Sequence, residues 1–151
     1  MPKCPCSSDV YIQRVTVEEN AAKAIFKNPD KKKFTKTQVD GCLMKNETAC
    51  DWFITREDCD GVLVELKGSD VAHALDQIKA SFAYLRDQNR LTLRRAGLVV
   101  CVKRPQHPAF NSKVQRVKEH LRKNYSAPLH IIVGNKELEF DRLLEHAAYR
   151  P

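Results

Sequence analysis

Two acidic residues and a lysine stand at spacings that could bring them together for phosphoryl-transfer chemistry. Asp51 opens a segment rich in β-forming residues, and Glu65 and Lys67 lie two positions apart near the end of the next such segment. Side chains at positions i and i+2 of a strand point to the same face of a sheet, so Glu65 and Lys67 share a face. If the two segments pair as a hairpin, Asp51 approaches Glu65. Two carboxylates and one ammonium group would then meet at one point.

Such a cluster suits a divalent cation. Burying two carboxylates is costly unless a cation or a polar ligand offsets their charge. Carboxylate oxygens, together with a backbone carbonyl and water, are ligands that Mg²⁺ or Mn²⁺ prefers. A neighbouring lysine can orient a water molecule or stabilise charge on an attacked phosphate. The pattern therefore predicts a metal-dependent phosphodiesterase centre.

Simpler interpretations of the same residues exist. Glu65 and Lys67 could form a solvent-facing strip on an edge strand, and Asp51 could serve only to begin a strand or a turn. The 61–67 segment is too apolar for an ordinary surface strand. Two charged residues within so apolar a strand indicate a specific role. Asp40 could join the site from the preceding segment, although a turn role before Gly41 is the simpler interpretation.

The elements that must position these residues can be predicted from hydrophobic periodicity and capping signals. Thr16 and Glu19 have the form of a capping box, which predicts a helix that ends at Asn28-Pro29. The further expected elements are strands over 38–44, 50–55, 61–67, 97–102, 129–133 and 137–140, and helices over 70–85, 110–121 and 141–148. This order predicts an α/β fold with a mixed central sheet and flanking helices. We expect one domain over 1–151, with a core at about 16–102 and a C-terminal β/α extension at about 109–151.

The spacing of the three residues resembles the D…E-x-K signature of the PD-(D/E)xK, or restriction-endonuclease-like, nuclease superfamily. Asp51 is followed by thirteen residues and then by Glu65-Leu66-Lys67, with Cys50 in place of the proline of the family pattern. The predicted order α-β-β-β-α-β over 16–102 is similar to the core of that family. The resemblance implies that Asp51, Glu65 and the carbonyl of Leu66 bind the metal, and that Lys67 assists the water.

Two further site residues follow from the resemblance. Many members of the family carry a glutamate on the first helix, and Glu18 is our choice because Glu19 has a competing role in the capping box. Several subfamilies carry a glutamine on the helix after E-x-K, where this chain has Gln77. RecB-like members have a tyrosine four residues after that glutamine. This chain has Ser81 there, which speaks against a RecB-type assignment.

The charge balance favours a polyanionic partner. The chain has 26 Lys and Arg against 19 Asp and Glu, which gives a net charge of +7. We predict a Mg²⁺-dependent nuclease, with Mn²⁺ as a substitute, that cleaves DNA endonucleolytically and acts as a homodimer. Two alternatives stay open: a non-cleaving nucleic-acid-binding or interaction domain on the same fold, and an RNA-cleaving enzyme or toxin. The residues expected to contact nucleic acid are Lys31, Lys32, Lys33, Lys36, Lys45, Arg94, Arg95, Lys103 and Arg104. The basic residues of the 110–121 helix and its end are interpreted instead as a solvated face.

Cysteine usage and hydropathy predict a cytoplasmic protein with no membrane segment and no organic cofactor. Six cysteines fit a reducing compartment. Cys42, Cys50, Cys59 and Cys101 lie in or beside apolar runs and are expected to be buried thiols. Cys4 and Cys6 form a C-x-C without a second pair at zinc spacing, so no structural metal is expected. No stretch approaches the roughly 18 apolar residues of a membrane span.

Overall fold

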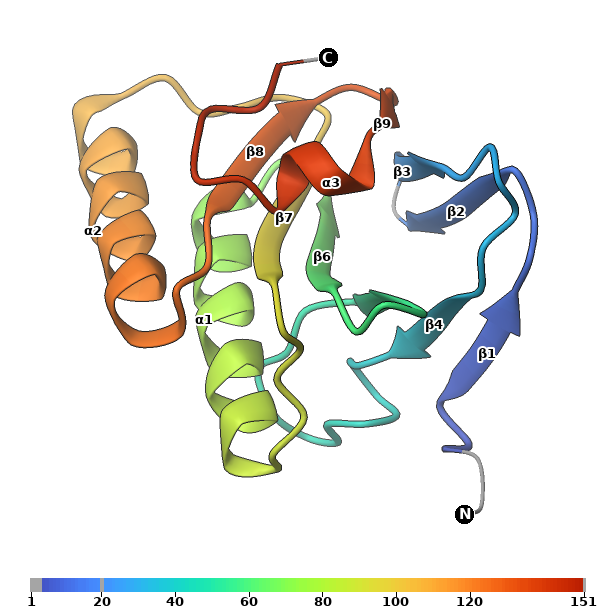
Figure 1. The fold of residues 1–151 in the computed structure, drawn as a ribbon. Helices are drawn as coiled ribbons and strands as arrows, with labels where there is room; N and C mark the ends of the chain where they lie inside the picture. The colour runs from blue at the N-terminus through green and yellow to red at the C-terminus, as the bar shows by residue number, and fades with distance from the viewer. Residues whose placement is uncertain (1–3, 20, 151) are drawn as a thin grey trace.

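The computed structural model describes residues 4–19 and 21–150 and has a mixed α/β architecture (Figure 1). Its larger sheet has the strand order β1-β4-β5-β6-β7-β8, and its smaller sheet has the order β2-β3-β9. The elements are β1 (Ser7–Val10), β2 (Arg14–Glu19), β3 (Ala22–Lys27), β4 (Phe34–Gln38), β5 (Trp52–Arg56), β6 (Gly61–Lys67), α1 (Val71–Asp87), β7 (Arg95–Cys101), α2 (Pro108–Tyr125), β8 (Leu129–Val133), β9 (Glu137–Leu138) and α3 (Phe140–Leu143). The prediction of an α/β fold with a mixed sheet is confirmed. None of the described helices combines the length and the apolar character needed to cross a membrane.

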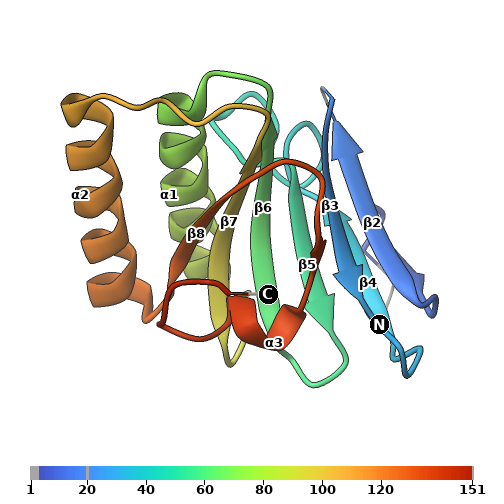
Figure 2. The same ribbon diagram turned by 90° about the horizontal axis from the view of Figure 1, so that it is seen from above.

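Two long helices cover one face of the larger sheet. Strands β4, β5 and β6 form an antiparallel meander, whereas β6, β7 and β8 run parallel and are joined by α1 and α2. Figure 2 shows both helices in one layer beside the sheet. Helix α1 begins after Asp70, whose side chain accepts a hydrogen bond from the backbone N–H of His73 and so caps the helix. Its apolar stripe packs against Phe53, Leu63 and Val99, which holds α1 over the middle of the sheet.

The other face of the larger sheet is covered by β2, β3, β9 and α3. A second apolar core lies between these layers, and it includes Phe26, Phe34 and Phe140. The ring of Phe140 stands edge-on to both other phenylalanines, with centroids 5.8 Å and 5.1 Å away. The site-bearing strand β6 is therefore buried on both faces.

The helix predicted to begin at Thr16 is wrong, because this segment forms the β2–β3 hairpin. Burial alternates along both strands: Val15 and Val17 on β2, and Ala24 and Phe26 on β3, all face the second core. This period of two matches a strand, whereas the capping-box pattern occurred in a segment whose β-branched residues favour an extended chain. The predicted core order α-β-β-β-α-β therefore lacks its first helix.

The region between β4 and β5 also differs from the prediction. The strand expected over 38–44 is displaced to Phe34–Gln38, and a loop rich in turns follows it up to β5. Cys42 in this loop forms a disulfide with Cys6, so it is not a free thiol. Cys50 and Cys101 are buried thiols as predicted, but Cys59 is exposed in the β5–β6 turn at φ 67°.

Candidate active site

The pairing of β5 with β6 brings the two predicted carboxylates together. Trp52 lies opposite Val64 in this antiparallel pair, and the same register continued by one residue places Asp51 opposite Glu65. Residues that face each other across an antiparallel pair have Cβ atoms about 5 Å apart. The backbone N–H of Leu66 donates a hydrogen bond of 2.9 Å to Oδ2 of Asp51, which fixes this carboxylate at the end of β6.

Glu65 is the most deeply buried charged group of the cluster. Its side chain is 1% exposed, and Oε2 lies 3.4 Å from Nζ of Lys67, which is 22% exposed. Oε1 is buried and has no hydrogen-bond partner. Burial, followed by the charge of Asp51, raises the pKa of Glu65 from 4.5 to about 8, although Lys67 opposes this shift. One carboxylate oxygen is thus left in a place that favours a proton or a cation.

A third carboxylate comes from the β2–β3 hairpin. Glu19 lies at the end of β2, and burial together with a hydrogen bond to Asp51 raises its pKa from 4.5 to about 7. The predicted Glu18 points elsewhere: it pairs with Lys23 at 3.7 Å and is 69% exposed. The structure therefore does not bring Glu18 to the other carboxylates, and the helix on which its choice depended is a strand. The alternation of Val15 and Val17 was the signal that would have selected Glu19.

Gln77 fixes the segment of the chain just before Asp51. Its Nε2 donates a hydrogen bond of 3.0 Å to the carbonyl of Ala49, and its Oε1 is buried without a partner. Ser81 accepts a hydrogen bond of 2.8 Å from the backbone N–H of Cys50 and donates one of 2.8 Å to the carbonyl of Gln77. These two residues of α1 fix the backbone just before Asp51. The role of Ser81 was missed, and only its position one turn after Gln77 pointed to it.

The donor set fits a cation held by few protein ligands. Among the residues that the structure describes, no three His, Cys, Asp or Glu side chains form a group that could hold a metal ion. Asp51 and Glu65 supply two carboxylates, and the unpartnered Oε1 of Glu65 is the oxygen that most needs a positive charge. Mg²⁺ is commonly bound by one or two carboxylates and keeps several waters, so two side chains suffice.

The predicted nucleic-acid contacts do not all lie at this end of the sheet. Phe34 pairs with Arg56, and Gly61 pairs with Arg95, at the end opposite Glu65. Lys31, Lys32 and Lys33 precede Phe34 and so lie far from the site, as do Arg94 and Arg95. Lys36 lies in the middle of β4, where its ammonium group donates a hydrogen bond of 2.8 Å to the carbonyl of Thr16.

Only three of the predicted basic contacts lie on the same side as Glu65. Lys45 belongs to the β4–β5 loop, which is tied to the backbone of Asp51 by a 3.0 Å hydrogen bond from Val39. Lys103 and Arg104 follow Cys101, which is in register with Lys67. Of the predicted basic contacts, these three are therefore the ones placed to serve a substrate at Glu65.

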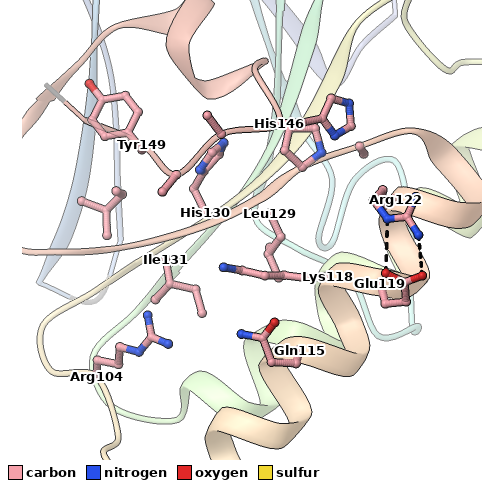
Figure 3. Close-up of a pocket in the computed structure, with 15 residues that line it drawn as sticks. Arg104, Gln115, Lys118, Glu119, Arg122, Leu129, His130, Ile131, His146 and Tyr149 are labelled. Atoms are coloured by element: carbon pink, nitrogen blue, oxygen red, sulfur yellow. Dashed lines mark hydrogen bonds and ion pairs between the residues drawn. The ribbon is translucent and has the colours of Figure 1, made fainter.

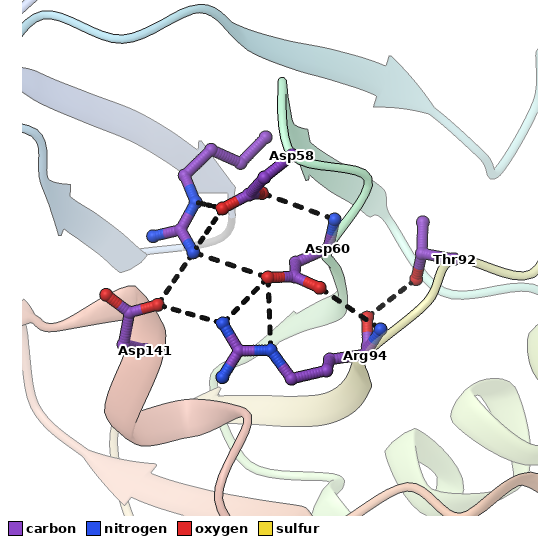
Figure 4. Close-up of polar contacts among 6 residues, drawn as sticks. Asp58, Asp60, Thr92, Arg94 and Asp141 are labelled. Atoms are coloured by element: carbon purple, nitrogen blue, oxygen red, sulfur yellow. Dashed lines mark hydrogen bonds and ion pairs between the residues drawn. The ribbon is translucent and has the colours of Figure 1, made fainter.

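Arg94 takes part in an ion-pair network at the far end of the sheet. Its Nη2 lies 2.8 Å from Oδ2 of Asp60 and 3.2 Å from Oδ1 of Asp141, as Figure 4 shows. Arg56 contacts the same two aspartates and Asp58. The three aspartates neutralise the two arginines and link α3 to the β5–β6 turn. The arginines therefore have little positive charge left to bind a phosphate.

No protein-family model matches this chain, and no curated protein or solved structure matches it at a significant level.

Proposed function

We propose that this protein is a Mg²⁺-dependent nuclease that hydrolyses phosphodiester bonds of DNA at the cluster of Asp51, Glu65 and Lys67. The observation that carries the proposal is the buried carboxylate of Glu65. Its Oε1 has no partner, its Oε2 contacts Lys67, and it lies across the β5–β6 pair from Asp51. Without a ligand, the buried charge destabilises the folded protein. Destabilising groups of this kind are common at functional sites.

The arrangement of the elements supports a variant of the restriction-endonuclease-like core. The order β4-β5-β6-α1-β7 corresponds to the β-β-β-α-β part of the family pattern, and β7 runs parallel to β6. The β2–β3 hairpin takes the place of the first helix and contributes Glu19 instead of Glu18. The carboxylates and Lys67 thus lie at the carboxyl end of a parallel strand, where open α/β sheets commonly bind ligands.

Each residue of the cluster has a distinct part in this proposal. Asp51 and Glu65 would hold the Mg²⁺ together with the carbonyl of Leu66. The bound ion would supply Lewis-acid polarisation of the phosphoryl group and a water of lowered pKa. Lys67 is held beside Glu65 and offers its N–H groups to the attacking water or to a non-bridging phosphate oxygen. Gln77 and Ser81 position the backbone of Asp51 through Ala49 and Cys50.

A substrate panel with two site variants tests the proposal. Duplex, single-stranded, branched and supercoiled DNA, and RNA, are incubated with Mg²⁺, Mn²⁺ or EDTA. We expect cleavage of DNA that requires the metal and falls by about a hundred- to a thousandfold in Asp51→Asn and in Lys67→Ala. Glu18→Gln is the matched control, because it removes a carboxylate on an exposed side chain next to the site and should leave the rate unchanged.

The outcomes separate the alternatives. Cleavage of RNA alone would support the same centre with a different substrate. Metal binding and DNA binding without cleavage would support a non-cleaving domain. Cleavage by Asp51→Asn at the wild-type rate would place the reaction elsewhere and refute the proposed centre.

A further inference from the structure

A cavity of about 450 Å³ lies beside β8, away from the carboxylates (Figure 3). Strand β8 is the edge of the larger sheet, and its residues line one side of the cavity. Helix α2 lines a second side with Gln115 and Lys118, and residues 146–149 line a third. Apart from Arg104, the cavity is therefore built from the C-terminal part of the chain, between residues 115 and 149.

The cavity carries an excess of positive charge. Its one acidic residue, Glu119, is held by Arg122, whose Nη2 lies 2.5 Å from the carboxylate (Figure 3). Lys118 has no ion pair or hydrogen bond among the described residues, and Arg104 has a ring contact with Phe110 at 5.7 Å. Burial lowers the pKa of His130, which lines the cavity, and the charge of Lys118 lowers it further. An anion would offset this charge.

The cavity is connected to the proposed active site through Arg104. Lys67 at the end of β6 is in register with Cys101 of β7, and Cys101 is in register with Val133 of β8. Arg104 comes three residues after Cys101 and lines the cavity.

We propose that the cavity beside β8 is a phosphate-binding subsite, in which Lys118 and Arg104 hold the nucleic-acid backbone beyond the bond that is cleaved at Lys67. This inference rests on the proposed nuclease function, because it names where the substrate is held. The charge of Lys118 is free for a phosphate, in contrast to that of Arg94, which is shared between Asp60 and Asp141. Phosphate contacts of this kind fix the register of a substrate without reading its sequence.

Two basic residues of α2, one that lines the cavity and one that does not, provide the test. Lys118→Ala removes the cavity cation, whereas Arg116→Ala removes an exposed cation of α2 that does not line the cavity. Binding of a labelled 20-base-pair duplex is measured in EDTA at several NaCl concentrations. We expect Lys118→Ala to weaken binding and to reduce the slope of log K against log [salt] by about one, with a smaller change for Arg116→Ala.

A small substrate separates the subsite from the chemistry. With bis(p-nitrophenyl) phosphate, which cannot reach the cavity from Lys67, Lys118→Ala should keep the wild-type rate, while KM for the long duplex rises. If the wild type cleaves DNA but Lys118→Ala binds the duplex as tightly as Arg116→Ala, the subsite is overturned and the nuclease stands. If the wild type shows no cleavage, and Lys118→Ala nevertheless weakens duplex binding, the proposed nuclease function is refuted and the cavity is supported as a nucleic-acid contact.

Inorganic phosphate distinguishes a polymer from a small anion. Phosphate alone is titrated into the wild type and into Lys118→Ala by NMR. A loss of phosphate binding in Lys118→Ala with unchanged duplex binding would identify a small-anion site and overturn the proposal. Loss of both, or of duplex binding alone, supports a backbone contact.

Discussion

Replacing Glu65 by glutamine should stabilise the metal-free protein at high pH and abolish its response to Mg²⁺. The carboxylate is buried, with Oε1 unpartnered and Asp51 nearby, and its pKa is raised to about 8 chiefly by burial. Folding therefore favours the protonated form of Glu65. The stabilising contribution is complete below the unfolded pKa of 4.5 and is lost as pH rises towards 8. Glutamine is uncharged like the protonated form, so its contribution to the free energy of unfolding does not fall as pH rises.

The size of the effect follows from this shift. A rise of the pKa from 4.5 to about 8 makes ionisation in the folded protein less favourable by about 5 kcal/mol, at about 1.4 kcal/mol per pKa unit. Asp51 raises the pKa values of both Glu65 and Glu19, so part of this cost stays in the cluster when Glu65 is replaced. We expect Glu65→Gln to raise the free energy of unfolding at pH 9 by about 2–5 kcal/mol, and to leave it nearly unchanged at pH 4.

Urea unfolding in EDTA measures this difference. Trp52 is the one tryptophan of the chain and follows Asp51 directly, so its fluorescence reports on this end of β5. Unfolding is measured at pH 4, 7 and 9 for the wild type, for Glu65→Gln and for Glu47→Gln, which is a control on an exposed loop residue. Glu47→Gln should follow the wild type at every pH.

Magnesium provides the second half of the test. If the folded wild type binds Mg²⁺ as proposed, a concentration of one hundred times Kd should stabilise it by about 2.7 kcal/mol at pH 7, and Glu65→Gln should lose most of this gain. A difference between the two proteins that is the same at pH 4 and pH 9 would refute the assignment of the effect to the charge of Glu65. A full Mg²⁺ response in Glu65→Gln would remove this residue from the metal site.

Three further predictions concern other parts of the molecule. Glu19→Gln should lower the cleavage rate more than Glu18→Gln, because Glu19 lies against Asp51 whereas Glu18 is exposed; equal rates in a steady-state assay would contradict the hairpin geometry. Arg56→Ala should lower the free energy of unfolding by about 3 kcal/mol at pH 7, since it removes a buried partner of Asp60. A hydrogen bond to Arg56 lowers the pKa of Asp141, so this loss should shrink as pH falls through that lowered pKa, and thermal unfolding at pH 7 and pH 3 checks the trend. Replacing Lys31, Lys32 and Lys33 together by alanine should leave the salt dependence of DNA binding unchanged, because these residues lie at the far end of the sheet; a slope reduced by about three would place the DNA there.

The strands that carry the site could be predicted because each has a strong local signal. The apolar run that contains Val62, Val64 and Leu66 specifies a strand buried on both faces, and Glu65 and Lys67 within it are conspicuous for that reason. The turn between β5 and β6 is short, so the antiparallel pairing with Asp51 follows from the chain itself. These elements depend on local sequence and little else.

The hairpin that supplies Glu19 could not be chosen as readily. Thr16 and Glu19 satisfy a helix-capping pattern, while Val15 and Val17 satisfy a strand pattern, and both patterns occupy the same few residues. The tertiary context decides between them, because the alternating side chains of β2 and β3 cover the face of the sheet that includes Ile54 and Leu98. A single amphipathic helix would cover this face less completely than the small sheet and α3 do together.

The direction of the meander also determines which basic residues can serve the site. Charge alone selected Lys31–Lys33 and Arg94 together with Lys103 and Arg104, because all of them flank strands of the sheet. In an antiparallel meander, however, the residues before β4 and those before β5 lie at opposite ends, so Lys31–Lys33 are separated from Asp51 by the length of a strand. Parallel strands instead bring their carboxyl ends to one edge, where Lys67 ends β6 and Arg104 lies in the loop after β7. In the proposed nuclease, a substrate bound at Glu65 would therefore extend along this edge towards β8, and the cations that it would reach there come from the loop after β7 and from α2.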